Sequence, residues 1–308
     1  MRRDWDVIIA GAGPAGLSAA LVLGRACRRV LLCDTGTPRS WASKEMHAYL
    51  SRDGIVPSRF LELSRNEVVK YPGVTFRQVE IITARRARDG FEVTLANERR
   101  VHCRKLLIAT GVYDLLPPIQ GVDAFYGRSV FQCPYCDGWE MRGRRIAVYG
   151  RRQRGLAMAR AMTGWARDIV LCTDGRSGYS AEQRRALDRN GIVLNEKRIS
   201  TLKGTRGRLQ ALVFRDGKTL ARDALFFDTP SRHQSKLAQS LGCEFTRDGG
   251  VRCGDYEATT VPGVFVAGNI IRDVQLSIVA AAEGARAAFG IHRSLTREDF
   301  DKRARVVR

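Results

Sequence analysis

The sequence of 308 residues has no uninterrupted apolar run as long as a membrane-spanning helix needs, which is about 18 residues. We therefore expect no membrane span. Met-Arg-Arg followed by an apolar stretch superficially resembles a secretory signal, but Asp4 and Asp6 precede that stretch and three glycines interrupt it. Arg25 before Cys27 also spoils a lipoprotein-type cleavage site. We predict a cytoplasmic protein.

The cysteines are widely scattered along the chain. Eight cysteines in a chain of this length are too few and too widely spaced for a scaffold held together by disulfides. Cys33, Cys103 and Cys172 lie in or beside apolar, strand-like runs, where we expect buried and unreactive thiols. The pair with redox or ligand spacing is Cys133 and Cys136, in the stretch CPYCDGWE.

Acidic residues and lysine are both under-represented relative to arginine. The formal net charge is +20, from 52 basic and 32 acidic residues, and only eight of the basic residues are lysine. The arginines are spread along the chain, and no basic motif interleaved with aromatics suggests a nucleic-acid module. We expect no nucleic-acid partner. Two explanations of the positive charge stay open. It results from a compositional bias toward arginine, or it serves to attract an acidic partner.

What the sequence does contain is a βαβ pattern at its start, DVIIAGAGPAGLSAALVLGRACRRVLLCD. An apolar run at residues 6–10 predicts a buried parallel strand, and a helix is expected from about Pro14 to Gly24. Gly11 permits a tight turn, Gly13 allows backbone to approach a pyrophosphate, and Gly16 lets the helix pack closely on the strand. A second strand ends at Asp34, which is placed to bind a ribose. The pattern predicts a dinucleotide site.

Two later segments indicate which dinucleotide binds. KLLIATG (residues 105–111) is an apolar strand ending in Ala-Thr-Gly, and VPGVFVAGNIIRDVQLSIVAAAEGARAA (residues 261–288) reads as strand, Gly-Asn turn and long helix. With these elements the chain resembles the flavoprotein disulfide reductases that have two dinucleotide-binding domains. The resemblance implies bound FAD, with the helix beginning around residues 274–277 and facing the flavin. The implied FAD-binding residues are Gly11, Gly13, Pro14, Ala15, Gly16, Asp34, Ala109, Thr110, Gly111, Gly268, Asn269, Gln275 and Leu276.

CPYC has three possible interpretations: part of a zinc site, a glutaredoxin motif, or a redox pair that exchanges electrons with a flavin. A zinc site needs further ligands, but Cys243 and Cys253 have nine residues between them and His233 is isolated, so we predict no metal site. Glutaredoxins carry the motif near the start of a small domain. Here it follows the Ala-Thr-Gly strand and precedes a second βαβ-like segment (residues 144–174), which resembles the low-molecular-weight thioredoxin reductases.

The same resemblance assigns roles to the motif residues. Cys136 would face the flavin and form a charge-transfer contact, and Cys133 would exchange with the sulfur of the substrate through a mixed disulfide. Asp137 matches the acid/base position of the family. The alternative for Asp137 is a simple turn or cap residue.

The second βαβ segment departs from an NADPH site. In Gly150-Arg-Arg-Gln-Arg-Gly155 the middle glycine of the fingerprint is Arg152, which opposes close approach to a pyrophosphate. Asp174 stands where NADPH-dependent relatives carry an arginine-rich signature, and it would repel the ribose phosphate. We therefore expect no NADPH binding, and NADH would still have to overcome Arg152.

Relatives without a nicotinamide site suggest two electron partners. Ferredoxin-dependent flavin thioredoxin reductases accept electrons from an acidic protein, in keeping with the charge of +20. Dithiol oxidases, as in gliotoxin- and holomycin-type pathways, pass electrons to oxygen, and residues 47–54 and 274–284 look more like that branch. Many oxidases are expected to have histidine after the second cysteine, whereas this chain has Asp137. The sequence leaves both partners open.

We thus predict an α/β fold of two Rossmann-like dinucleotide-binding domains, the second inserted in the first. Residues 1–116 and 229–308 form the FAD domain, and residues 117–228 form a degenerate NAD(P)H-type domain that carries the redox pair. The predicted activity is FAD-dependent thiol–disulfide exchange by a homodimer acting on a small dithiol or a thioredoxin-like protein. The alternatives are a conventional NADPH-dependent thioredoxin reductase and a non-catalytic basic flavoprotein.

Overall fold

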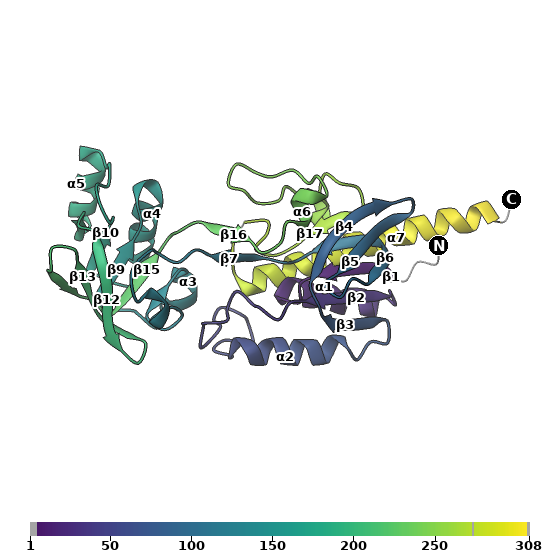
Figure 1. The fold of residues 1–308 in the computed structure, drawn as a ribbon, viewed down its shortest axis with the longest axis horizontal. Coiled ribbons are helices and arrows are strands. Elements are labelled where there is room, and N and C mark those ends of the chain that lie inside the picture. Colours follow the sequence, from purple (N-terminus) through teal and green to yellow (C-terminus); the bar gives the residue numbers. More distant parts are fainter. Residues whose placement is uncertain (1–4, 273, 307–308) are drawn as a thin grey trace.

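The computed structural model describes residues 5–272 and 274–306. Its elements form two lobes, joined by a narrow ribbon of two antiparallel strands, β7 (Val112–Asp114) and β16 (Ser231–His233) (Figure 1). The first lobe contains residues from both ends of the chain, and the second contains the middle of the chain. The α/β fold with parallel sheets in both lobes confirms the predicted fold class. The predicted domain boundaries at residues 116 and 229 stay predictions.

The first lobe is built on a seven-stranded sheet in the order β3-β2-β1-β6-β5-β4, with β17 also paired to β6. The strands β3, β2, β1, β6 and β17 are parallel, and β5 and β4 add an antiparallel edge. The elements of this lobe are β1 (Trp5–Ala10), α1 (Pro14–Arg25), β2 (Val30–Asp34), α2 (Pro57–Val68), β3 (Val74–Gln78), β4 (Ile81–Ala87), β5 (Gly90–Leu95), β6 (Arg100–Ile108), α6 (Leu237–Ser240), the 3-10 turn η2 (Asp255–Glu257), β17 (Val264–Val266) and α7 (Ser277–Val306).

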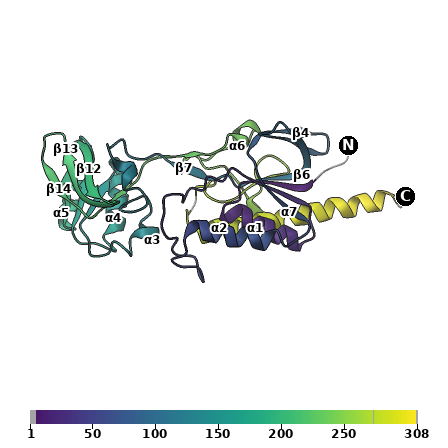
Figure 2. The same ribbon diagram turned by 60° about the horizontal axis from the view of Figure 1, so that its bottom comes forward.

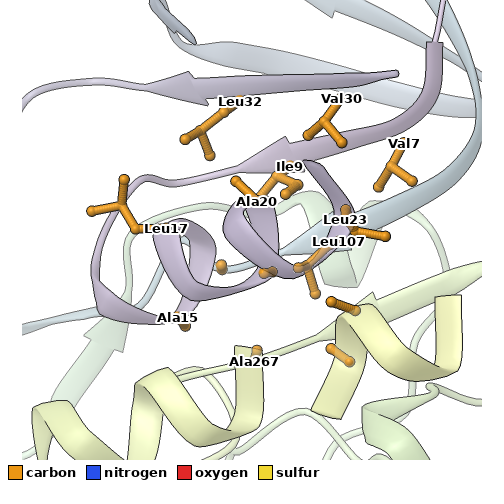
Figure 3. Packing of buried hydrophobic residues seen from close by; sticks show 14 of the residues in the cluster. Val7, Ile9, Ala15, Leu17, Ala20, Leu23, Val30, Leu32, Leu107 and Ala267 are labelled. Atoms are coloured by element: carbon orange, nitrogen blue, oxygen red, sulfur yellow. The ribbon is translucent and has the colours of Figure 1, made fainter. Parts of the chain in front are cut away.

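Helices α1, α2 and α7 lie on one side of this sheet (Figures 1 and 2). The alternating side chains of each strand divide the core between the two faces. Val7 and Ile9 of β1 pack with Leu23 of α1 on the helical face (Figure 3), whereas Ile8 belongs to the cluster on the opposite face. Burial on both faces explains why β1 reads as a continuous apolar run and not as an alternating pattern.

The crossing of α1 and α7 depends on small residues. A Cβ atom on Gly284 of α7 would lie 2.0 Å from the carbonyl oxygen of Ala15, and a Cβ on Gly16 of α1 would lie 1.8 Å from that of Gly11. Helix α1 therefore contacts both α7 and the turn after β1 through backbone atoms. This close approach fixes α7, which begins at Ser277 as predicted, directly beside the N-terminus of α1.

The second lobe has a five-stranded parallel sheet in the order β11-β10-β9-β15-β8 and a three-stranded antiparallel sheet in the order β12-β13-β14. The predicted second βαβ unit is confirmed as β9, α4 and β10. The elements of this lobe are the 3-10 turn η1 (Val122–Ala124), β8 (Val130–Phe131), α3 (Pro134–Asp137), β9 (Ile146–Tyr149), α4 (Arg152–Met162), β10 (Ile169–Cys172), α5 (Ala181–Arg189), β11 (Ile192–Asn195), β12 (Ile199–Thr205), β13 (Arg208–Phe214), β14 (Thr219–Ala221) and β15 (Ala224–Phe227).

Three expectations concern single residues or segments of this fold. Cys33, Cys103 and Cys172 are buried as predicted, and burial raises the pKa values of Cys33 and Cys172 to about 12, so these thiols stay protonated. The strand expected to end at Gly111 instead ends at Ile108, and Ala-Thr-Gly forms the turn beyond it. Among residues 5–272 and 274–306, no helix has the length and apolar character needed to cross a bilayer.

Candidate active site

A cavity of about 760 Å³ lies at the carboxyl ends of the parallel strands in the first lobe and extends to the redox pair of the second lobe. Ligands commonly bind at this edge of an open α/β sheet. The cavity brings together all the predicted site residues except Gly16, which packs α1 against the strand as its predicted role requires. Residues more than 250 positions apart in the chain thus line one space, from Gly11 to Leu276.

The turn between β1 and α1 has the shape that the glycine fingerprint predicts. Gly11 has a φ angle of +104°, and a Cβ there would lie 2.4 Å from the carbonyl oxygen of Ala109. Around Gly13, by contrast, no heavy atom of the described residues other than its chain neighbours lies within 4 Å of a would-be Cβ, so this position is open toward the cavity. Pro14 begins α1 and removes one N–H group that would otherwise lack a partner.

The polar groups of the cavity fit a dinucleotide such as FAD. Asp34, the last residue of β2, accepts hydrogen bonds from the backbone N–H groups of Ala12 and Gly36, each at 2.5 Å. A carboxylate offers more acceptor positions than these two bonds use, so ribose hydroxyls can still be bound. The Thr110 hydroxyl is buried at the cavity wall without a hydrogen-bond partner in the described part of the chain. A bound ligand would supply that partner.

The Gly268-Asn269 turn closes the cavity on the side of α7. Gly268 has a φ angle of +81°, its N–H group donates to Glu283 at 2.6 Å, and a Cβ there would lie 3.1 Å from that of Ala15. The turn is therefore tied to both α1 and α7. Asn269, Gln275 and Leu276 line the cavity before α7 begins, in keeping with the flavin-facing positions proposed for them.

The redox pair is a disulfide in this structure. Cys133 and Cys136 are joined, with their Cα atoms 5.3 Å apart, at the start of the short helix α3. The Cys136 N–H group donates to the Cys133 sulfur at 3.1 Å. A backbone donor at this sulfur favours its thiolate form after reduction, which suits Cys133 to the exchanging role that the family resemblance implies.

Asp137 has the electrostatic environment of an acid/base residue. Burial, and then the nearby charge of Glu140, raise the pKa of Asp137 from 3.8 to about 7, while His47 acts in the opposite direction. A carboxyl group with a pKa near neutrality can both accept and donate a thiol proton. Its position beside the disulfide, in the wall of the cavity, is a stronger indication than its place in the motif.

Sequence reasoning did not identify His47 as a site residue. This histidine lies in the loop between β2 and α2 and lines the same cavity as the disulfide, although it belongs to the other lobe. Its ring nitrogens lie 3.4 Å from Glu45, 3.5 Å from Asp53 and 3.7 Å from Glu140. The one available signal was the similarity of residues 47–54 to the oxidase branch.

Sequence reasoning also missed an arginine at the junction of the lobes. Arg39 lies five residues beyond Asp34 and contacts Asp114, Gln132 and Gln275 inside the cavity wall. No local motif marks these residues, because their contacts span between 75 and 236 positions of the chain.

The nucleotide-type turn of the second lobe differs from that of the first. Gly150 and Gly155 still pack closely, since a Cβ on Gly155 would lie 2.4 Å from the Gly150 carbonyl oxygen. Arg152 occupies the middle position with a φ angle of +51° and an exposed side chain. Arg151 reaches across the end of β10, where it donates to the carbonyl oxygens of Thr173 and Asp174.

The sequence was compared with protein-family models and with known proteins, and both comparisons match most of the chain. A family model described as pyridine nucleotide-disulphide oxidoreductase matches residues 5–284. Thioredoxin reductase tcpT of Claviceps purpurea is 30% identical over 275 residues, which cover 86% of this chain and 86% of that protein. The thioredoxin reductase of Bacillus subtilis is 26% identical over 296 residues, covering 92% of this chain and 91% of the relative.

Among solved structures, that of HlmI superposes with a TM-score of 0.92 at 34% sequence identity. The superposition covers 98% of this chain and 96% of that one. The likeness therefore extends over both lobes, and it is not restricted to the dinucleotide-binding turn.

Proposed function

The chain belongs to the pyridine nucleotide-disulphide oxidoreductase family, and on that premise we propose that it exchanges electrons between bound FAD and a dithiol without using a nicotinamide cofactor. The family membership and its thioredoxin reductase relatives establish a flavoprotein of the thioredoxin reductase type. The independence from NADPH is our proposal.

The observation that carries the proposal is the position of Arg151. In a Rossmann-type unit the nucleotide ribose binds at the end of the second strand, and here that strand is β10. The Arg151 side chain occupies this edge: its Nε donates to the Thr173 carbonyl oxygen at 2.6 Å, and its guanidinium also contacts the carboxylate of Asp174 at 3.5 Å. Asp174 itself accepts from the backbone N–H of Ile199 at 2.8 Å. These contacts of Arg151 at the end of β10 support a second lobe that does not use a nicotinamide nucleotide.

The chemistry on the thiol side follows from the disulfide and its neighbours. A substrate thiolate attacks the Cys133 sulfur, the Cys133–Cys136 bond breaks, and Cys136 takes the electron pair. The second substrate thiolate then attacks the substrate sulfur of the mixed disulfide and releases Cys133. Two electrons and two protons have then passed from the substrate to the cysteine pair, with Asp137 placed to move the protons. Bound FAD supplies the two-electron chemistry that restores the disulfide.

The identity of the partners is also part of the proposal. We propose a small dithiol or a thioredoxin-like protein as the thiol substrate, since the relatives are named thioredoxin reductases. Oxygen or an acidic ferredoxin would exchange electrons with the flavin, and the net charge of +20 suits the acidic protein. We further propose a homodimer in the cytoplasm.

A second candidate function is that of a conventional NADPH-dependent thioredoxin reductase. The retained close packing of Gly150 and Gly155 favours it, and one relative of 26% identity is named an NADPH-dependent thioredoxin reductase. In that case Arg151 would have to release β10 when the nucleotide binds.

The deciding experiment is an anaerobic titration of the FAD-loaded protein with excess NADPH, and separately with NADH, while the flavin absorbance is recorded. We expect no bleaching with either nucleotide and rapid bleaching after dithiothreitol is added. Bleaching by NADPH would overturn the proposal in favour of the conventional enzyme. Readmitting air, or adding oxidised ferredoxin, then identifies the electron acceptor. The Cys136→Ser variant serves as the control, because it should lose bleaching by dithiothreitol.

A further inference from the structure

Arg39 joins four separate segments of the chain at one point. It lies in the loop after β2 and forms a two-bond ion pair with Asp114 at the end of β7, with Nε 2.8 Å and Nη2 2.6 Å from the two carboxylate oxygens. Nη1 donates to Gln275, at 2.5 Å, just before α7. Nη2 also donates to the side chain of Gln132 in the second lobe. One guanidinium thus connects both lobes with the strand between them.

The position of Gln132 in the chain connects this cluster to the disulfide. Gln132 immediately precedes Cys133, whereas Gln275 is a predicted flavin-facing residue of the first lobe. Hydrogen bonds from Arg39 to Gln132 and to Gln275 therefore link the disulfide segment to the flavin side of the cavity. The planar fork of arginine can hold several acceptors in fixed directions, which the point charge of lysine cannot do.

The cluster is largely buried, and its charged groups are paired. The Asp114 side chain is only 4% exposed and that of Arg39 is 20% exposed. The Tyr126 hydroxyl of the second lobe donates to Asp114 at 3.2 Å, and burial raises the pKa of Tyr126, so its proton remains in place. The ring of Tyr126 also contacts Trp41 of the first lobe, with ring centroids 6.0 Å apart. Buried charged networks of this kind are costly to disturb and hold one arrangement strongly.

We propose that Arg39 is a positioning residue for disulfide–flavin exchange, which holds the Cys133–Cys136 segment at the flavin cavity by coupling Gln132 to Gln275. Arg39 acts through these residues and does not itself exchange electrons or protons. This role rests on the proposed exchange between the disulfide and the flavin, and it is the same whichever electron partner the protein uses.

Two variants test the proposal, one by removing a single hydrogen-bond acceptor and the other by changing the arginine itself. Gln132→Leu removes only the acceptor on the disulfide segment and leaves the Arg39–Asp114 pair intact, whereas Arg39→Lys retains the charge and loses the fork. Arg104→Gln is the matched control, because Arg104 is a buried arginine paired with Glu298 and Asp299 and lies outside the cavity. Any general effect of disturbing the contacts of a buried arginine appears in the control as well.

We expect both test variants to slow flavin reduction by dithiothreitol roughly 10- to 100-fold in single-turnover experiments, and to weaken the thiolate–flavin charge-transfer absorbance. FAD content should remain that of the unchanged protein. In the flavin-free protein, hydrogen–deuterium exchange across residues 129–137 should become faster in both variants. Arg104→Gln should lower thermal stability and leave the rate of flavin reduction, the charge-transfer absorbance and the hydrogen–deuterium exchange of residues 129–137 unchanged.

The proposal is overturned if Gln132→Leu and Arg39→Lys exchange electrons with dithiothreitol at the wild-type rate. It is also overturned if the 129–137 peptide exchanges hydrogen no faster than in Arg104→Gln. Because neither readout uses NADPH, failure of this proposal is distinguishable from failure of the proposed function.

Discussion

The carboxyl group of Asp137 lies one residue beyond Cys136, and burial together with Glu140 raises its pKa to about 7. Below that pH the carboxyl keeps its proton, and above it the charged form can act as a base for the cysteine and substrate thiols. We expect the rate of flavin reduction by dithiothreitol to rise through about pH 7, and Asp137→Asn to lower that rate about 100-fold and remove the inflection. Stopped-flow measurements across the pH range test this expectation.

The His47→Gln and Glu140→Gln variants check the assignment of that inflection. His47 lowers the pKa of Asp137 and Glu140 raises it. Removing His47 should therefore move the inflection to higher pH, and removing Glu140 should move it to lower pH. His102→Gln, which changes a histidine outside the cavity, should leave it in place. Shifts in the same direction for His47→Gln and Glu140→Gln would contradict the role given to Asp137.

The same carboxyl group affects stability with a defined sign. Its pKa rises from 3.8 to about 7 on folding, so the folded state disfavours the charged form. The wild-type protein therefore loses stability relative to Asp137→Asn as the pH rises from about 4 to about 7. The difference between the two thermal midpoints should grow over that window. A constant difference would show that the carboxyl is not buried in this way.

At the scale of secondary-structure elements, two glycines of the α1–α7 layer should separate cofactor binding from folding. Gly13→Ala places a methyl group where no described heavy atom beyond the chain neighbours lies within 4 Å, so the fold should persist while the cavity at the pyrophosphate position narrows. We expect FAD affinity to fall about tenfold, equivalent to ~1.4 kcal/mol, with the apoprotein's thermal stability unchanged. Equilibrium FAD titration and thermal unfolding of the apoprotein measure the two effects.

Gly284→Ala is the matched substitution on α7. Its methyl group would lie 2.0 Å from the Ala15 carbonyl oxygen, so the helices must separate, at a cost of about 1–3 kcal/mol in unfolding free energy. FAD affinity should fall as well, because the Gly268 turn is tied to both helices. If Gly13→Ala destabilised the apoprotein as much as Gly284→Ala, the separation of roles would be wrong.

These elements could be predicted because their requirements are local. Gly11, Gly13 and Gly16 meet backbone demands within one turn, and each apolar run is long enough to define a buried strand. The Arg39 cluster could not be predicted, since its hydrogen bond to Gln275 joins residues 236 positions apart. Arg151 was overlooked for a related reason: the sequence showed that Arg152 and Asp174 were unusual, but only the fold shows Arg151 lying across β10.

At the scale of the whole molecule, the two lobes lie end to end (Figure 1). Residues of both lobes line the cavity, Cys133 and Cys136 among them, so the arrangement of the lobes determines whether the disulfide lines it. Besides the Arg39 cluster, Gly127 of the second lobe approaches the first lobe so closely that a Cβ would lie 2.3 Å from the carbonyl oxygen of Ala42. Both Gly127 and Gly143 have left-handed backbone, with φ angles of +69° and +72°. Around Gly143, however, no described heavy atom other than those of its chain neighbours lies within 4 Å of a would-be Cβ. The two positions therefore differ in the contact and not in the strain.

We accordingly expect Gly127→Ala and Gly143→Ala to pay a similar backbone cost of about 1–2 kcal/mol, while only Gly127→Ala pushes the lobes apart. Gly127→Ala should slow flavin reduction by dithiothreitol roughly tenfold or more, because a small displacement of reacting groups is enough to do so. Small-angle scattering should show a changed radius of gyration for this variant alone. If both variants slowed exchange equally, backbone strain and not lobe contact would be the cause, and the arrangement of the lobes would lose its place in the mechanism.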